Sequence, residues 1–173
     1  MGLKVGTVEL CSYNEKWVEE FEKEQINLKN IFSDLAFSIE HIGSTSIPGL
    51  SAKPIIDIAV GIERLEDFDN VRYIFENIKD YEIKENPTPG EILIVKGTED
   101  ITTHLIHVME YTSSRYIESI LFRDYLINHP DLIKEYESLK SELAIKYAND
   151  RKTYTANKND FIQNVLKKAK KAI

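Results

Sequence analysis

The sequence predicts a mixed α/β (α+β) fold, in which helices flank a β-sheet and the last third of the chain is helical. Up to about residue 110, short apolar runs typical of strands alternate with the apolar spacing of amphipathic helices. From Ser113 onward only the helical spacing remains. A length of 173 residues fits one domain over residues 1–173, with a core at about 1–110 and a helical part at 111–173.

The first half of the chain predicts a helix, a strand, a turn, a second strand and a second helix. Ser12 and Glu15 have the spacing of a capping box, ahead of an apolar helical stripe through Trp17, Leu28 and Phe32. Residues 36–42 alternate as a strand does, and residues 43–49 suit a turn and a short helix. Residues 54–61 are nearly all apolar, which indicates a central strand, and residues 65–78 predict a long helix.

The second half predicts short strands and then helices. Residues 81–84, 92–96 and 103–109 read as strands joined by antiparallel hairpins, with a breaker at residues 86–90. A helical stripe begins at Ser113 and stops before Pro130, which suits the first turn of the next helix. A last helix starts at about Asn159.

Composition limits the class of protein. No apolar run approaches the roughly 20 residues of a membrane span, and the N-terminus lacks the apolar core of a secretory signal. A single cysteine, Cys11, fits a reducing compartment, so we expect a cytoplasmic protein without a membrane partner. The net charge is −7, with about −13 on residues 1–150, so we expect no nucleic-acid partner. The lysines at 167, 168, 170 and 171 suit the end of a helix, or else form a basic patch for RNA or another anionic partner.

The most informative segment runs from His41 to Val60 and places a Gly43-Ser44 turn ahead of Asp57, which lies in an otherwise apolar strand. A carboxylate is costly to bury unless it is paired, hydrogen-bonded or bound to a metal. Backbone N–H groups at a Gly-Ser turn that opens a short helix favour a phosphate. The segment therefore predicts a phosphate held near a metal ion.

A glycine and a serine followed by a carboxylate within a strand resemble the signature of the nucleotidyltransferase fold. That fold usually carries Asp-x-Asp or Asp-x-Glu on the strand, and two such carboxylates share one face and grip Mg²⁺. Here the second position is Ala59.

The longer phrase from His41 to Ile58 resembles the hallmark of the GrpB family, which is assigned to the nucleotidyltransferase fold. Residues 103–108, the Phe122-Arg123-Asp124-Tyr125-Leu126 element with His129-Pro130, and Tyr154 with Lys158 and Phe161 also resemble family motifs. The resemblance spans nearly the whole chain and implies a nucleotidyltransferase-like mixed sheet flanked by helices. It implies no settled substrate.

Asp57 and His107 are the candidate catalytic and metal-binding residues. Asp57 is expected to hold Mg²⁺ or Mn²⁺, or instead to accept hydrogen bonds from the turn. His104 and His107 face opposite sides of a regular strand, and His107 would be a nitrogen ligand or a base if its face is the site face. A purely structural role, without contact to a metal or a ligand, stays open for both histidines.

The candidate phosphate-binding residues are Gly43, Ser44, Thr45, Lys53, His41 and Lys158. Ser44 would bind phosphate or cap the short helix. Lys53 would reach a phosphate or point to solvent, and His41 would contact a ligand or bond a backbone carbonyl. Lys158 would close over a ligand or pack against the helices.

The leading hypothesis is a protein that binds a nucleoside triphosphate or a phosphorylated metabolite, with Mg²⁺ or Mn²⁺ as cofactor. If active, it would transfer a nucleotidyl group to a small molecule or a protein. The rival hypothesis is a degenerate, non-catalytic ligand-binding or interaction module, and Ala59 is the residue that favours it.

Overall fold

A mixed β-sheet forms the centre of the molecule in the computed structural model, which describes residues 1–84 and 88–172. Strand order is β2 (Ala36–Ile42), β3 (Ile56–Ile62), β6 (Ile101–Glu110), β5 (Glu91–Gly97) and β4 (Tyr81–Lys84), and β1 (Leu3–Lys4) pairs with the start of β6. The β3–β6 pair is parallel, and the other pairs are antiparallel. The predicted mixed α/β class is therefore confirmed.

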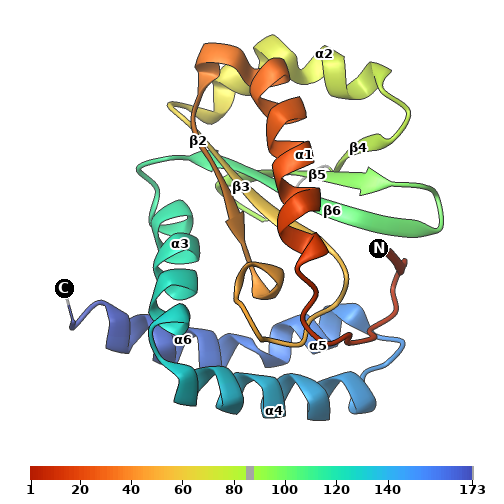
Figure 1. Cartoon of the computed structure of the whole chain (residues 1–173). Coiled ribbons are helices and arrows are strands. Elements are labelled where there is room, and N and C mark those ends of the chain that lie inside the picture. The colour runs from red at the N-terminus through yellow and green to blue at the C-terminus, as the bar shows by residue number, and fades with distance from the viewer. Residues whose placement is uncertain (85–87, 173) are drawn as a thin grey trace.

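Helices cover the sheet from two sides (Figure 1). The helix α1 (Lys16–Phe32) lies across one face, beside the short helix η3 (Leu65–Phe68) and α2 (Asp69–Asn77). The C-terminal helices α3 (Ser114–Ile127), α4 (Pro130–Lys146), α5 (Arg151–Asn157) and α6 (Asn159–Ala169) gather at the other side of the sheet. Segments far apart in sequence thus meet around β3 and β6.

The main core lies between α1, α2 and the sheet. Alternate residues of β3, Ile56, Ile58 and Val60, are fully buried there against Leu28 and Phe32 of α1. Burial of apolar surface contributes about 25 cal/mol per Å² to folding, so this layer stabilises the central strands. A second cluster joins α3, α4 and α6 to Ile47 and Leu50, which follow the turn after β2.

Most predicted elements are present, with local differences. The predicted capping box is wrong, because helix α1 begins at Lys16 and the N–H of Lys16 binds the Asn14 side chain at 3.0 Å rather than Ser12. The predicted helix over 65–78 is split into η3 and α2. Strand β1 and helix α5 were not predicted, and Asn86 and Pro87 of the predicted breaker lie outside the described residues.

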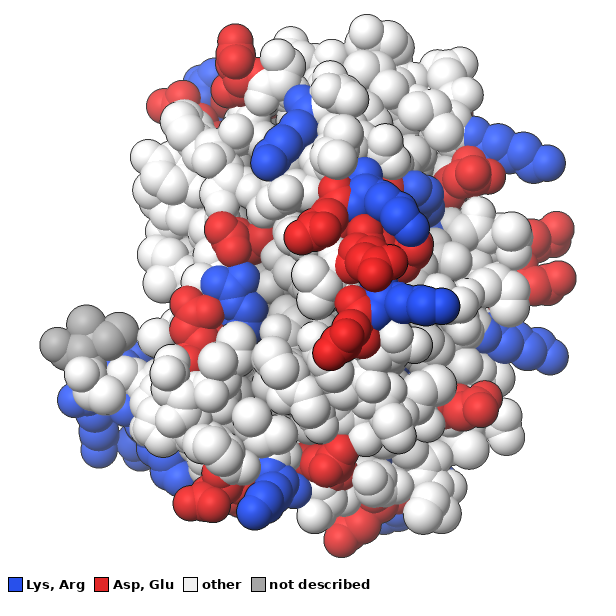
Figure 2. Space-filling model, in the orientation of Figure 1, with Lys and Arg blue, Asp and Glu red and all other residues white. Residues whose placement is uncertain are grey.

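Charged residues of both signs are interspersed on the face in Figure 2, and basic side chains gather beside the C-terminus. The lysines at the end of α6 are Lys167, Lys168, Lys170 and Lys171. Lys170 donates to Glu118 of α3 at 2.6 Å, so at least one of these lysines links the end of α6 to α3. Among the described residues, no helix has the length and apolar character that crossing a membrane requires.

Candidate functional site

A cavity of about 690 Å³ lies between the sheet and the C-terminal helices. Its floor comes from β3, β5 and β6, and its wall comes from α3, α4, α5 and α6. Seven of the eight predicted site residues line it: Gly43, Ser44, Thr45, Lys53, Asp57, His107 and Lys158. The fold thus brings together residues that are up to 115 positions apart in the sequence.

Strand register explains why the polar groups meet on this face. In the parallel pair, Asp57 of β3 lies beside Leu105 of β6, and Ala59 lies beside His107. Because side chains alternate along a strand, Asp57 and His107 share one face, while His104 faces α1. The prediction that His104 and His107 face opposite sides of the sheet is confirmed: of the two, His107 lines the cavity, and His104 is buried under α1 near Glu20 and Glu24.

The turn after β2 packs directly on Asp57. Gly43 has φ +69°, and a Cβ atom there would lie 2.5 Å from the Asp57 Oδ2 atom. Only glycine allows this approach at low cost. The Ser46 hydroxyl donates to the Gly43 carbonyl at 2.6 Å and fixes the turn, from which Ser44 and Thr45 line the cavity.

His107 lies between two carboxylates. Its Nε2 atom is 3.6 Å from Asp57 Oδ1, and its Nδ1 atom is 3.3 Å from Glu91 Oε2. Arg115 Nε of α3 donates to the same Glu91 oxygen at 2.7 Å. The four side chains form a continuous chain of alternating charge along the cavity floor.

This arrangement shifts the pKa of each member. Burial acts to lower the pKa of His107, but the neighbouring carboxylates of Asp57 and Glu91 outweigh it and raise the pKa to about 9. Burial acts to raise the pKa of Glu91, but His107 and Arg115 lower it to about 2. Burial also acts to raise the pKa of Asp57, but His107 outweighs it and keeps the pKa of Asp57 below its usual value. His107 is therefore an imidazolium at neutral pH.

Three lysines from separate segments line the other side of the cavity. Lys53 Nζ and Lys158 Nζ lie 5.5 Å and 4.7 Å from the centroid of the Tyr154 ring, on which both cations are stabilised. Lys140 is only 1% exposed and donates to the Ser51 carbonyl. Within residues 1–84 and 88–172, none of the three has a carboxylate oxygen within 4.0 Å.

Burial without a counter-ion lowers the pKa of these lysines. It lowers the pKa of Lys140 to about 7 and that of Lys158 to about 8, and the charges of neighbouring lysines add to both shifts. Burial also lowers the pKa of Lys53. An anion in the cavity would relieve this cost by pairing with the ammonium groups.

His41 lies outside this set of lining residues. Its ring stacks on Phe21 of α1, with 4.8 Å between the centroids, and its Nε2 atom lies 2.9 Å from Thr45 Oγ1. In β2 it pairs with Ile58, whose side chain is in the core under α1. The structure therefore places His41 behind the turn, where it supports Thr45 instead of facing the cavity.

The sequence analysis missed Glu91, Arg115 and Lys140. Lys140 carried a usable signal, because it follows Tyr136 by four residues and precedes Leu143 by three, which places a lysine on the buried stripe of α4. Glu91 and Arg115 gave no such signal. Their pairing depends on how α3 folds back over the start of β5.

The donor set does not fit the predicted Mg²⁺ or Mn²⁺ ion when His107 is protonated. Asp57 and Glu91 face the two ring nitrogens of His107 at 3.6 Å and 3.3 Å, and the doubly protonated ring that pairs with both carboxylates has no lone pair for a metal. The second carboxylate position is Ala59, which is fully buried among Ile42, Met109 and Tyr116. In the described part of the chain, no three His, Cys, Asp or Glu side chains group as metal ligands.

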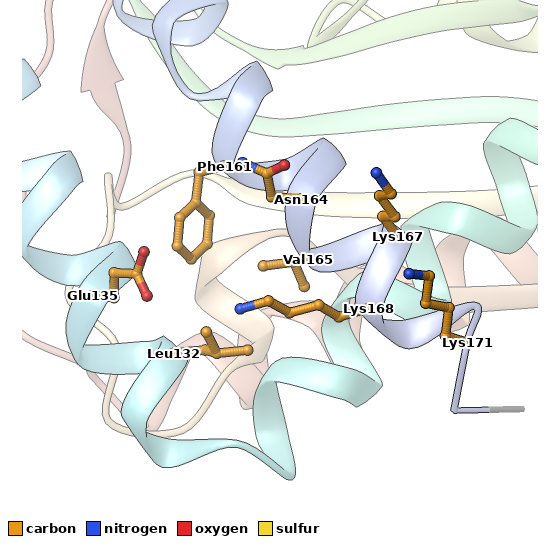
Figure 3. Close-up of a pocket in the computed structure, with 8 residues that line it drawn as sticks. All are labelled: Leu132, Glu135, Phe161, Asn164, Val165, Lys167, Lys168 and Lys171. Carbon is orange, nitrogen blue, oxygen red and sulfur yellow. The ribbon is translucent and has the colours of Figure 1, made fainter.

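A smaller cavity of about 260 Å³ lies between α4 and α6 (Figure 3). Its apolar residues are Leu132, Phe161 and Val165, with Lys167, Lys168 and Lys171 on one side of them and Glu135 on the other. These three lysines are exposed to solvent. The larger cavity, with its buried and unpaired cations, is therefore the candidate site.

Comparison with known proteins supports the resemblance seen in the sequence. The family model described as "GrpB protein" matches residues 7–168. The glutamate-rich protein GrpB of Alkalihalophilus pseudofirmus is 40% identical over 172 residues, which cover 96% of this chain and 98% of that protein. Protein YqkA of Bacillus subtilis is 38% identical over 170 residues, which cover 95% of this chain and 48% of that protein.

Solved structures show the same fold. The crystal structure of the conserved protein GrpB from Enterococcus faecalis matches with a TM-score of 0.86 and 36% identity, over 95% of this chain and 98% of that chain. The structure of a GLD-2/RNP-8 complex matches with a TM-score of 0.57 and 12% identity, over 84% of this chain and 57% of that one. The second likeness concerns the fold alone.

Proposed function

The chain belongs to the GrpB family, and from the cavity between its sheet and its C-terminal helices we propose that it binds a phosphorylated small molecule. The observation that carries the proposal is the convergence of Lys53 and Lys158 on this cavity. Both lysines are partly buried, and neither has a carboxylate partner among the described residues. Such cations are costly unless an anion completes the site.

The turn supplies the second part of the proposed phosphate site. Ser44 and Thr45 belong to the short helical turn η2 (Ser44–Ser46), which follows Gly43. Ser44 and Thr45 line the cavity on the side of Asp57, and Lys53 and Lys158 line it beside Tyr154. A phosphate between these groups would receive hydrogen bonds from the turn and charge from the lysines.

The remaining surface favours an organic ligand over inorganic phosphate alone. A volume of about 690 Å³ lies within the range of about 300 to 1,000 Å³ found for small-molecule sites. Leu105, Met109, Phe122 and Ile162 give part of the lining an apolar character. A nucleotide, or another phosphorylated metabolite with an apolar or aromatic part, suits this combination.

Binding is favoured over nucleotidyl transfer as the function. The transfer implied by the fold resemblance needs a second carboxylate beside Asp57, and buried Ala59 occupies that position. We therefore assign no reaction to the cavity. The proposal is a non-catalytic or substrate-binding role for a phosphorylated ligand.

The experiment is a thermal-melt screen of the purified protein with inorganic phosphate, pyrophosphate, sugar phosphates and nucleoside mono- and triphosphates, with and without Mg²⁺. A ligand that binds only the native state raises the melting temperature, so we expect a rise of a few degrees for at least one organic phosphate. Lys53→Gln and Lys158→Gln should remove the rise. Lys168→Gln, an exposed lysine of α6, is the matched control and should retain it.

The proposal is contradicted if none of these compounds raises the melting temperature. It is also contradicted if the rise persists when Lys53 and Lys158 are replaced together, because the phosphate then binds elsewhere.

A further inference from the structure

We propose that this cavity binds a phosphomonoester as a free dianion, without a divalent metal, and that His107 supplies the positive charge that a metal ion would bring. The inference rests on the proposed function, because it concerns the same cavity and a phosphorylated ligand. It goes further by naming the charge state of the ligand and the residue that replaces the metal.

The first argument is the geometry of His107. A carboxylate faces each ring nitrogen, Asp57 at 3.6 Å from Nε2 and Glu91 at 3.3 Å from Nδ1. A protonated imidazole has two N–H donors and no lone pair, so it satisfies both carboxylates only as a cation. The ring thus carries a fixed charge at the floor of the cavity.

The second argument is the place of that charge. In parallel register His107 lies beside Ala59, the position at which the resembled fold carries its second carboxylate. A site with two carboxylates there needs a metal ion to neutralise them before a phosphate can approach. Here alanine occupies the second position, and the positive charge of His107 beside it already neutralises the negative charge of Asp57.

The third argument is the balance of charge around the cavity. Four cations face two carboxylates: Lys53, His107, Arg115 and Lys158 against Asp57 and Glu91. Glu118 also lines the cavity, but Lys170 neutralises it at 2.6 Å. Two positive charges remain, which match the charge of about −1.5 to −2 on a phosphomonoester at neutral pH.

Lys140 adds a variable charge to this balance. It is buried beside Tyr136 and lines the cavity, and its ammonium group donates to the Ser51 carbonyl. A triphosphate brings about four negative charges and would exceed the balance even with Lys140 protonated. A phosphomonoester is therefore the favoured class of ligand.

The test is isothermal titration calorimetry with adenosine 5′-monophosphate, run once in EDTA and once in excess Mg²⁺. We expect binding in EDTA, with Kd changed by less than about threefold in Mg²⁺. His107→Gln removes the cation and should weaken binding in EDTA by at least about tenfold, which corresponds to about 1.4 kcal/mol. His104→Gln changes the histidine on the opposite face of β6 and is the matched control.

Asp57→Asn separates the two accounts of the site most sharply. If Asp57 were a metal ligand, this variant would lose metal-dependent binding altogether. In the metal-free site it removes one partner of His107 and also one negative charge near the phosphate, so binding should persist with Kd changed by less than about tenfold. His107→Lys retains a cation and should bind in EDTA, which keeps the test valid if His107→Gln is unstable.

Each outcome has a distinct meaning. Binding that requires Mg²⁺ and is lost in Asp57→Asn overturns this inference and leaves the proposed function intact. Wild-type affinity in His107→Gln overturns it as well. Absence of binding for adenosine 5′-monophosphate in both buffers, together with no rise in melting temperature for any compound of the thermal-melt screen, overturns the proposed function itself.

Discussion

At the scale of single residues, His107 controls the charge of the cavity floor. Its side chain is 19% exposed, and it lies between Asp57 and Glu91 on the central strand β6. A cation held in this way needs no conformational change to meet an anion. The same contacts link the protonation of His107 to the stability of the fold.

The pKa of about 9 predicts a specific dependence of stability on pH. Because the pKa of His107 is raised on folding, its contribution is fully present below about pH 6.5 and is lost as the pH rises through about 9. From pH 6 to 10, the difference in free energy of unfolding between wild type and His107→Gln should shrink by roughly 3 kcal/mol. Denaturant unfolding of both proteins at a series of pH values measures this difference.

The comparison with His107→Gln is necessary because Lys140 and Lys158 change the pH dependence of stability in the direction opposite to that of His107. Their pKa values are lowered on folding to about 7 and about 8, so their contribution to stability grows as the pH rises toward 10.5. A difference between the two proteins that stays constant over this pH range would contradict a protonated His107.

Gly43 is the residue that sets the distance between the turn and Asp57. Gly43→Ala places a methyl group 2.5 Å from Asp57 Oδ2 and also strains a φ of +69°. Gly49→Ala is the matched control, because φ is +80° but no atom lies within 4 Å of the new Cβ. Each should lose about 1 kcal/mol from backbone strain, and Gly43→Ala should lose at least about 1 kcal/mol more.

Chemical denaturation of the two glycine variants tests this difference directly. Gly43→Ala should also weaken phosphate binding, while Gly49→Ala should not. Equal losses of stability in both variants would show that the contact of the turn with Asp57 is loose.

Some single residues could be assigned from sequence and others could not. Asp57 was recognisable because a lone carboxylate in an apolar strand requires a partner. The sequence gives no sign that this partner is a cation of the protein itself, since the pairing of Asp57 with His107 depends on the parallel register of β3 and β6. The prediction of a metal ion at Asp57 and His107 was therefore made without knowledge that the two side chains face each other at 3.6 Å.

At the scale of elements, the two faces of the sheet are lined by different polar groups. His107 faces the cavity, and on the other side of the sheet α1 buries Glu24 to 2% exposure. Glu24 accepts hydrogen bonds from Tyr81 of β4 at 2.6 Å and from Lys96 of β5. This buried network fixes α1 against the outer strands and so holds the sheet that carries the site.

Removal of one partner from this network should destabilise the fold. Lys96→Met leaves Glu24 buried with only Tyr81 and Asn27 as donors, which should cost about 2 to 3 kcal/mol in free energy of unfolding. Lys23→Met removes an exposed pair with Glu20 on the same helix and should have little effect. Equal effects in urea unfolding would mean that the network does not hold α1 in place.

Elements were predictable where their pattern was local. Strand β2 was predicted with its observed bounds, and Pro130 begins α4 as expected. Helix α5 was missed because it is short, and its apolar stripe is reduced to the buried Tyr154. Strand β1 has two residues, and it is defined only by pairing with Ile101 and Thr102.

At the scale of the whole molecule, a basic cavity lies inside an acidic protein. The net charge is −7, yet the charges that face the cavity leave an excess of two cations. The order of helices explains this contrast, because α4, α5 and α6 bring Lys140 and Lys158 over a sheet that supplies His107. Local composition did not reveal this cavity, because its cations come from five separate segments.

The cavity joins the sheet to the C-terminal helices, so its ligand would contact both parts of the chain. Asp57 and His107 belong to the strands, and Thr155 and Lys158 belong to α5 and the residue that follows it. The central claim therefore has two parts. A phosphomonoester binds between the sheet and the C-terminal helices, and it binds there without a metal ion.

The most direct measurement of that claim is a crystal structure of the protein grown in EDTA with adenosine 5′-monophosphate. The account predicts a phosphate within hydrogen-bonding distance of Ser44, Lys53 and Lys158, with His107 as the nearest cation on the sheet side. A phosphate bound outside this cavity, or one that enters it only together with a metal ion on Asp57, would contradict the account.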